Sequence, residues 1–250
     1  IPMIYAISQS LKPLDELWMF PPRFLVRNPT LKNFSDLFSL MSSSWVPVSR
    51  YIFNTVLISF VGTGGHLVFA SMAAYALSKH KFRGRTVIFE TIVLSLMFST
   101  AVTAVPNFLI ISKLGMMNTY WALILPAFSS SMGLYLMKQF MEQMVPDTVL
   151  EAARIDGSGE FRTFLTIAIP MCKPAIAVQA IFAFVQNWNN FYTQNMIIIS
   201  NEKRFTMPIM IQSVLGQDKH PDLGAQYAAV ALSVIPIIVI YLILSRFIVA

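Results

Sequence analysis

Long apolar stretches separated by short polar segments dominate the chain. A membrane-spanning helix needs about 20 consecutive, mainly apolar residues. Five stretches meet this requirement with no Asp, Glu, Lys or Arg before their last residue, namely 55–77, 91–111, 119–137, 175–200 and 225–244. Each such charge at a helix centre would cost about 2.5–3.5 kcal/mol on insertion scales. The pattern therefore predicts five complete membrane spans.

The two ends of the chain extend this prediction. The apolar residues 1–7 are typical of the end of a sixth span, and the chain begins with Ile1 rather than Met. We therefore expect an all-α, polytopic transmembrane bundle with six spans, of which the first is truncated here and from which residues are missing at both ends. Prolines and polar residues at 12–49 predict an ordered outer segment that lies on the membrane surface.

Composition narrows the class further. Apolar side chains make up 56% of the 250 residues and charged ones 12%, whereas soluble domains carry about 25% charged residues. A soluble globule, a disordered chain and a collagen are therefore excluded. The single cysteine, Cys172, can form no internal bridge, so a disulfide scaffold is excluded as well.

The distribution of charge predicts the orientation. A dense basic loop at 79–85 and a longer loop at 138–174 are cytoplasmic by the positive-inside rule, whereas 10–51 and 201–224 then face outward with charges of mixed sign. The net charge of +6 thus reflects the orientation of the chain in the membrane and does not indicate nucleic-acid binding.

The sequence lacks the residues that proton relays, metal sites and catalytic sites require. Only His66 and Glu90 bring ionisable groups near the spans, and we interpret His66 as a helix-packing residue. The scattered histidines predict no metal site, and no grouping indicates catalysis. Because the sequence also lacks a phosphate-binding Gly-rich loop with its Lys, uphill transport would need energy from another polypeptide. A transporter, a channel and a passive anchor all remain compatible with this profile.

The cytoplasmic loop before the last two spans predicts a helix–Gly–helix elbow. Pro146 and Asp147 suit the first turn of a helix, and Gly157 can end it in a left-handed conformation. Leu150, Ala153 and Ile155 would form its apolar side. Ser158 would cap a second short helix with Glu160 in its first turn, and Pro170 and Pro174 prevent one continuous helix into the next span. The alternative is an amphipathic connector on the lipid surface.

This loop resembles the EAA loop of permease subunits of bacterial ABC importers. Glu151-Ala152-Ala153, three residues, Gly157, nine residues, Ile167, one residue and Ile169-Pro170 follow the family spacing, with Ile169 in place of the family's leucine. Other segments resemble the carbohydrate-uptake branch, and its maltose-type second permease in particular: Asn54-Thr55, 73–77, 82–85, 115–119 and Trp188-Asn189-Asn190-Phe191.

The resemblance implies a function and a set of partners. Residues 1–250 would form one transmembrane permease domain, with 146–170 as its cytoplasmic coupling loop. The expected partners are a homologous second permease, two ATPase subunits docked at this loop, an extracytoplasmic solute-binding protein and the lipid bilayer of the bacterial cytoplasmic membrane. ATP and Mg would be bound by the ATPase subunits, so this chain would be no enzyme and would hold no cofactor. The implied coupling residues are Glu151, Ala152, Ala153, Arg154, Asp156, Gly157 and Pro170.

A polar but uncharged cluster in the fifth predicted span indicates the transported solute. Amides and aromatic rings at membrane depth either pair between helices or line a wet cavity, and they suit sugar hydroxyls and sugar rings. The candidate pathway residues are Asn107, beside Pro106, together with Asn187, Trp188, Asn189, Asn190 and Tyr192. The alternatives are an ABC permease for another small polar solute, or an ATP-independent channel or secondary carrier.

Overall fold

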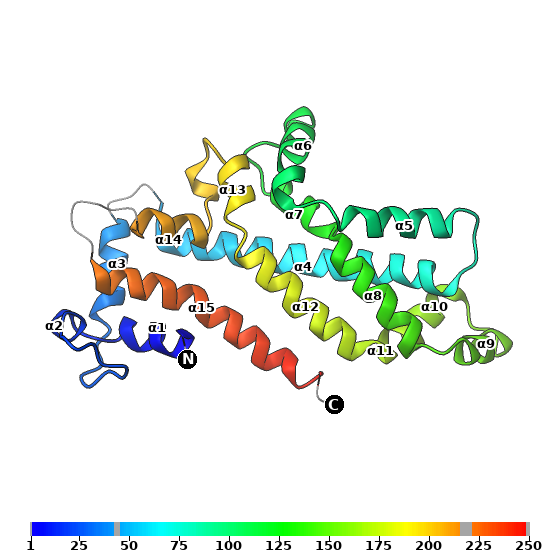
Figure 1. Ribbon diagram of the computed structural model, residues 1–250, viewed down its shortest axis with the longest axis horizontal. Helices are drawn as coiled ribbons and strands as arrows, with labels where there is room; N and C mark the ends of the chain where they lie inside the picture. The colour runs from blue at the N-terminus through cyan, green and yellow to red at the C-terminus, as the bar shows by residue number, and fades with distance from the viewer. Residues whose placement is uncertain (1, 43–45, 216–221, 249–250) are drawn as a thin grey trace. The chain divides into compact units, whose positions relative to one another are not determined.

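The computed structural model describes residues 2–42, 46–215 and 222–248, and in this part of the chain all regular structure is helical (Figure 1). This confirms the all-α prediction. Ile1 of the predicted first span and Asp218 of the outer loop lie outside the described residues. The chain forms two compact units, Ile1–Leu57 with Trp188–Ile240, and Ile58–Asn187 with Tyr241–Ala250. The prediction of a single permease domain stays a prediction.

The first unit packs short helices around a methionine-rich and alanine-rich core. Its buried centre includes Leu37, Met41, Met207, Met210 and Ala228. Its elements are α1 (Pro2–Ser10), α2 (Leu14–Leu17), α3 (Lys32–Ser42), the start of α4 (Val48–Lys79), α13 (Tyr192–Ile197), η2 (Glu202–Arg204), α14 (Met207–Leu215) and most of α15 (Leu223–Ser245).

Within this unit, the two segments predicted to face outward contact each other. Arg50 Nε–H donates to the Lys203 carbonyl oxygen (3.4 Å). Just beyond the first segment, the Asn54 side-chain amide donates to the carbonyl oxygens of Lys203 (2.9 Å) and Phe205 (2.7 Å), and the Met207 N–H donates to the Thr55 hydroxyl (2.8 Å). The Asn33 side-chain amide likewise donates to the carbonyl oxygens of Ser10, the last residue of α1, and of Lys12, two residues later. The predicted outer segment is therefore ordered where the structure describes it.

The second unit contains the rest of α4 and the helices that follow it. They are α5 (Arg85–Ser95), α6 (Thr100–Lys113), α7 (Trp121–Phe128), α8 (Ser131–Met144), α9 (Asp147–Ile155), α10 (Glu160–Thr163), η1 (Phe164–Ala168), α11 (Ile169–Met171) and α12 (Lys173–Trp188). One buried cluster joins the C-terminal end of α4, which we predicted to be cytoplasmic, to α8, α9 and η1 through Ala74, Tyr75, Met141, Leu150 and Phe164. This cluster places the elbow against α4 and α8.

Three of the predicted spans are not single straight helices. In the described residues, α4 and α15 are long and apolar enough to cross a membrane alone, and two bent pairs raise the number to four if each pair is one span. The predicted span 91–111 is interrupted between α5 and α6, which meet at 111°. The break lies at residues 96–99, whereas Pro106 lies inside α6. Span 175–200 begins with α12, which is bent by 80° from the helices before it and ends at Trp188.

The predicted span 119–137 is divided at a run of serines. Helix α7 ends at Phe128, and the Ser130 hydroxyl accepts a hydrogen bond from the Gly133 N–H (3.2 Å), which caps a new helix, α8. A serine cap satisfies an N–H group that the first turn of a helix leaves without a partner. Hydropathy cannot detect this break because both sides of it are apolar.

His66 packs between helices, as its isolation in the sequence predicts. Its Nε2 lies 2.9 Å from the side-chain nitrogen of Gln179 on α12, and its Nδ1 lies 3.3 Å from the Phe128 carbonyl oxygen at the end of α7. An amide nitrogen can only donate. In this arrangement His66 Nε2 therefore accepts from Gln179, and Nδ1–H donates to Phe128.

Candidate functional site

The elbow consists of two helices joined at Gly157. Helix α9 follows Pro146, and Gly157 adopts φ +77°. The Ser158 N–H donates to the Ala153 carbonyl (2.9 Å) and the Gly157 N–H to the Arg154 carbonyl (3.0 Å), which is the Schellman arrangement at a helix C-terminus. The predicted helix and its glycine stop are confirmed. The second helix is capped by Gly159 rather than by Ser158, whose hydroxyl instead accepts from Thr163 (3.0 Å).

One residue of α9 lies on a different face of the helix from the one we predicted. Leu150 is buried in the cluster shared with α4 and α8, and Ala153 is also buried, at 7% exposed. Ile155, which we predicted on the same apolar side, is 87% exposed. It lies five residues after Leu150, about 140° around the helix at 100° per residue, so helix geometry turns it outward. An exposed isoleucine at the tip of the elbow is a feature that our sequence reasoning missed.

The structure brings most of the predicted coupling residues together. A hollow of about 390 Å³ lies between the two arms of the elbow and is lined by Val149, Ala152, Ala153, Asp156, Gly157, Ser158, Arg162 and Ile167. Glu151 and Arg154 are exposed on α9. Pro170 lies apart from this hollow, in α11, where it follows the π-helical turn η1. The chain is then interrupted at Cys172 before α12, as the flanking prolines predict.

Ion pairs join the elbow to the basic loop that follows α4. Lys79, where α4 ends and this loop begins, has its Nζ 2.9 Å from Asp147 Oδ1, and His80 Nε2 lies 3.6 Å from Glu160 Oε2. The hydrogen bond and the charge of Lys79 lower the pKa of the Asp147 carboxyl below its ordinary value of 3.8. This pair therefore stays intact at neutral pH and is lost only as the pH falls through that lowered pKa. The two loops predicted to be cytoplasmic are thus in contact.

The candidate pathway residues lie at two separate places in the chain. Asn107 is exposed on α6. The other candidates lie at and around the interruption between α12 and α13, since α12 ends at Trp188 and α13 begins at Tyr192. Asn189 and Tyr192 are exposed, and the Asn190 side chain accepts from the Thr193 N–H (3.3 Å). Asn187 donates to the Thr63 hydroxyl (3.3 Å). Irregular backbone at membrane depth is tolerated where it is covered by protein or lines a cavity, which fits a pathway at this break.

Trp188 is the exception among these candidates. Its side chain is 1% exposed, and its indole N–H donates to the Ser233 carbonyl (2.9 Å) on α15. It therefore acts as an interhelical link, which is the packing alternative to a place in the pathway.

Replacing Trp188 with Phe should lower stability because the indole hydrogen bond to the Ser233 carbonyl and part of the buried ring volume are lost. A hydrogen bond of this kind contributes about 0.5–1.5 kcal/mol. We expect a lower Tm for Trp188→Phe in detergent-solubilised protein. Trp121 is exposed, so Trp121→Phe is the matched control and should leave Tm nearly unchanged. Equal Tm values for the two variants would contradict the assignment.

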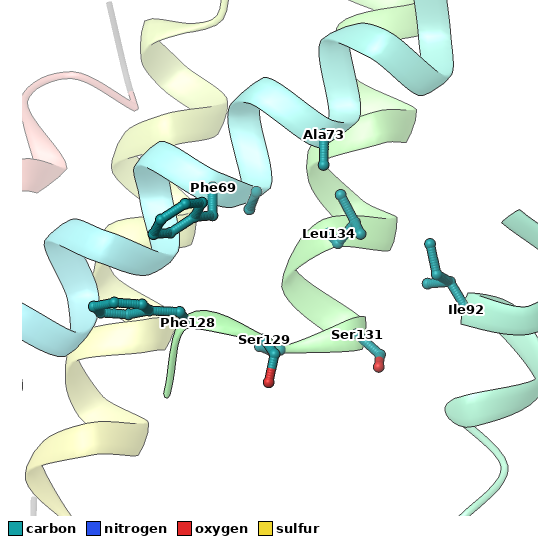
Figure 2. A pocket seen from close by; sticks show the side chains of 9 residues that line it. Phe69, Ala73, Ile92, Phe128, Ser129, Ser131 and Leu134 are labelled. Atoms are coloured by element: carbon teal, nitrogen blue, oxygen red, sulfur yellow. The ribbon is translucent and has the colours of Figure 1, made fainter. Parts of the chain in front are cut away.

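A larger hollow lies at the break between α7 and α8. It measures about 510 Å³ and is lined by Phe69, Ala70, Ala73, Ile92, Phe128, Ser129, Ser130, Ser131 and Leu134. Figure 2 shows the rings of Phe69 and Phe128 on one side, Ser129 on the connecting segment and Ser131 at the start of α8. The two ring centroids are 5.4 Å apart. The hollow is predominantly aromatic and aliphatic, with hydroxyl groups at the helix break.

Comparisons with known proteins place these features in a family. The arabinooligosaccharides transport system permease protein AraQ of Halalkalibacterium halodurans is 30% identical over all of this chain and 88% of its own length. The sn-glycerol-3-phosphate transport system permease protein UgpE of Yersinia enterocolitica is 31% identical over 93% of this chain and 84% of its own. The diacetylchitobiose uptake system permease protein NgcG of Streptomyces coelicolor is 27% identical over 98% and 80%, respectively.

A solved structure has the same fold. It is the crystal structure of a bacterial ABC transporter involved in the import of the acidic polysaccharide alginate, and one of its chains matches 98% of this chain and 89% of its own with a TM-score of 0.81 and 21% identity. The model of the family described as binding-protein-dependent transport system inner membrane component matches residues 26–250. The chain therefore belongs to this family of inner-membrane transport components.

Proposed function

We propose that this chain and a homologous second permease form the pathway by which a sugar or oligosaccharide crosses the bacterial cytoplasmic membrane by alternating access. Family membership makes the chain a permease component of an ABC importer, a transport subunit whose ATP is hydrolysed on a separate protein. The names of AraQ and NgcG support a carbohydrate, as do the uncharged amides between α12 and α13. The name of UgpE, which carries a phosphorylated solute, keeps another small polar solute as the alternative.

The observation that carries the mechanism is the elbow. Its exposed residues, Ile155 among them, would dock on an ATPase subunit that binds ATP and Mg. Residues 146–170 would form this coupling segment within a single permease domain. The seat would comprise Glu151, Ala152, Arg154, Asp156 and Gly157, whereas Ala153 would support it from below because it packs inward. A solvent-exposed isoleucine that directly precedes a residue of this hollow, Asp156, is suited to burial against a partner.

Replacing Ile155 with Asp should remove the partner without unfolding the permease. Because the side chain is exposed in this subunit, the variant should insert and fold normally but lose at least about ten-fold in affinity for the ATPase, the effect of truncating one well-buried interface residue. Co-purification of the tagged permease with its ATPase subunits measures this. Ile155→Leu is the control and should retain binding.

Two outcomes would contradict the proposal. Normal co-purification of Ile155→Asp would remove the elbow from the interface. Solute uptake by the permease in vesicles without any ATPase subunit would instead support the ATP-independent carrier.

A further inference from the structure

The Glu160 carboxylate joins three side chains from two distant parts of the sequence. Oε1 accepts from Arg154 Nε at 3.0 Å, across the Gly157 elbow. Oε2 accepts from the Tyr75 hydroxyl at 3.4 Å and lies 3.6 Å from His80 Nε2. One carboxylate thus connects both arms of the elbow to the cytoplasmic end of α4.

A second ion pair connects the other arm to the same helix end. Lys79, the last residue of α4, lies 2.9 Å from Asp147, the first residue of α9. The Lys79 side chain is 5% exposed, so its ammonium group has few directions open to it. Both arms of the elbow, α9 and α10, therefore have a charged connection to residues 75–80.

Aromatic rings surround this connection but do not fill the space around it. The Tyr75 ring lies 5.2 Å from the Phe164 ring and 5.3 Å from the His80 ring, centroid to centroid. Tyr75 and Phe164 are both buried in the cluster that also holds Leu150 of α9. A hollow of about 250 Å³ also lies here, lined by Met72, Tyr75, His80, Glu160, Phe161 and Phe164. The ring contacts alone therefore leave room for α10 to shift, and the contacts of Glu160 are needed to hold it against the end of α4.

We propose that Glu160 is a positioning residue for transport: it transfers the movement of the docked elbow to α4. This inference rests on the proposed function. Glu160 would touch neither the solute nor the nucleotide. Its carboxylate would keep α10 in register with Tyr75 and His80, so that a push on the elbow moves the end of α4 rather than turning the elbow alone.

The chemistry of the site separates this role from a purely structural one. The Glu160 side chain is 51% exposed, and exposed ion pairs contribute little to folding stability. The core of Tyr75, Phe164 and Leu150 would remain without it. Loss of the carboxylate should consequently leave folding and ATPase docking in place and impair only the transfer of movement.

The experiment uses the full complex of both permeases, the ATPase subunits and the solute-binding protein in proteoliposomes. Solute uptake and ATP hydrolysis are measured together, and their ratio gives the coupling. For Glu160→Gln we expect normal assembly, ATP hydrolysis close to wild type and a ratio that falls at least about five-fold, the lower end of typical coupling effects. Glu160→Asp, which keeps the charge, should recover part of the ratio.

Glu90→Gln is the matched control. Glu90 is an exposed acid on α5 and forms no ion pair among the described residues, so its ratio should equal that of wild type. A second variant exchanges the charges, Arg154→Glu with Glu160→Arg. It keeps an ion pair within the elbow but removes the acceptor for Tyr75 and places a cation beside His80. Because Arg154 also belongs to the proposed seat, the ratio is measured on purified complexes that retain the ATPase subunits, and there it should stay low.

Each contrary outcome has a separate meaning. A wild-type ratio in Glu160→Gln would overturn the proposal. Recovery of the ratio by the charge exchange would overturn it as well, since Glu160 would then act only through its ion pair with Arg154 inside the elbow. Failure of Glu160→Gln to bind the ATPase would also overturn it and assign the residue to docking. Failure of the wild-type permease to bind an ATPase would instead overturn the proposed function.

Discussion

Replacing Gly133 with Ala should strongly destabilise the second unit. A Cβ at this position in α8 would lie 2.2 Å from His66 Nε2 and 2.2 Å from the Gln179 side-chain nitrogen. Both side chains are buried, and each is held by a hydrogen bond: Gln179 donates to His66, which donates to Phe128. Neither side chain can therefore change its rotamer freely to make room for the added methyl group.

Two costs combine in this variant. Overpacking a well-filled core costs about 1–3 kcal/mol, and separating His66 from Gln179 would leave buried polar groups unpaired at about 1–3 kcal/mol. We expect a clear loss of Tm in detergent-solubilised protein and a lower yield of folded permease. Such a loss is large against the marginal stability of a typical protein.

Gly64 supplies the control for Gly133→Ala. It lies in α4, and a Cβ there would meet no heavy atom within 4 Å. Alanine is the better helix former by about 1 kcal/mol, so Gly64→Ala should leave Tm unchanged or raise it. A double variant, Gly133→Ala with His66→Ala, should lose less than the sum of its single variants because removing the imidazole makes room. A Tm for Gly133→Ala equal to wild type would contradict the close approach.

The sequence predicts where apolar helices occur better than it predicts whether they are continuous. Hydropathy sums over a window, so an apolar run looks the same whether its helix is straight or restarts halfway. The breaks depend on single hydrogen bonds, such as the one from the Gly133 N–H to Ser130 that begins α8. Pro106, the neighbour of the pathway candidate Asn107, lies inside α6 without ending it, because a proline removes one donor and neighbouring structure can compensate.

The elbow was predictable in outline because its signals are local. Pro146 and Gly157 act on their own backbone, and both ends of α9 follow from them. The contacts of Glu160 with Tyr75 and His80 had no such signal, since 85 residues separate Glu160 from Tyr75. The predicted pathway residues shared only polarity, which is why Trp188, with its link to Ser233, could not be told apart from its neighbours.

Replacing Gly157 with Pro should abolish solute uptake. Gly157 has φ +77°, whereas the proline ring requires a φ near about −65°. Proline also lacks the N–H that Gly157 donates to the Arg154 carbonyl at 3.0 Å to end α9. The two arms of the elbow must then take another angle, so we expect uptake to fall to background in proteoliposomes that contain the complete transporter.

A graded series at Gly157 tests the backbone cause. A Cβ there would meet no heavy atom within 4 Å, so only the left-handed conformation penalises a side chain. That conformation costs most non-glycine residues about 1–2 kcal/mol, and Asn tolerates it better than Ala. Uptake should therefore decrease in the order wild type, Gly157→Asn, Gly157→Ala, Gly157→Pro. Gly159 has φ −69°, a value that proline also adopts, so Gly159→Pro should retain far more uptake than Gly157→Pro. A lower uptake for Gly159→Pro than for Gly157→Pro would refute a role for the left-handed turn, because proline would then do more harm where the backbone already fits it.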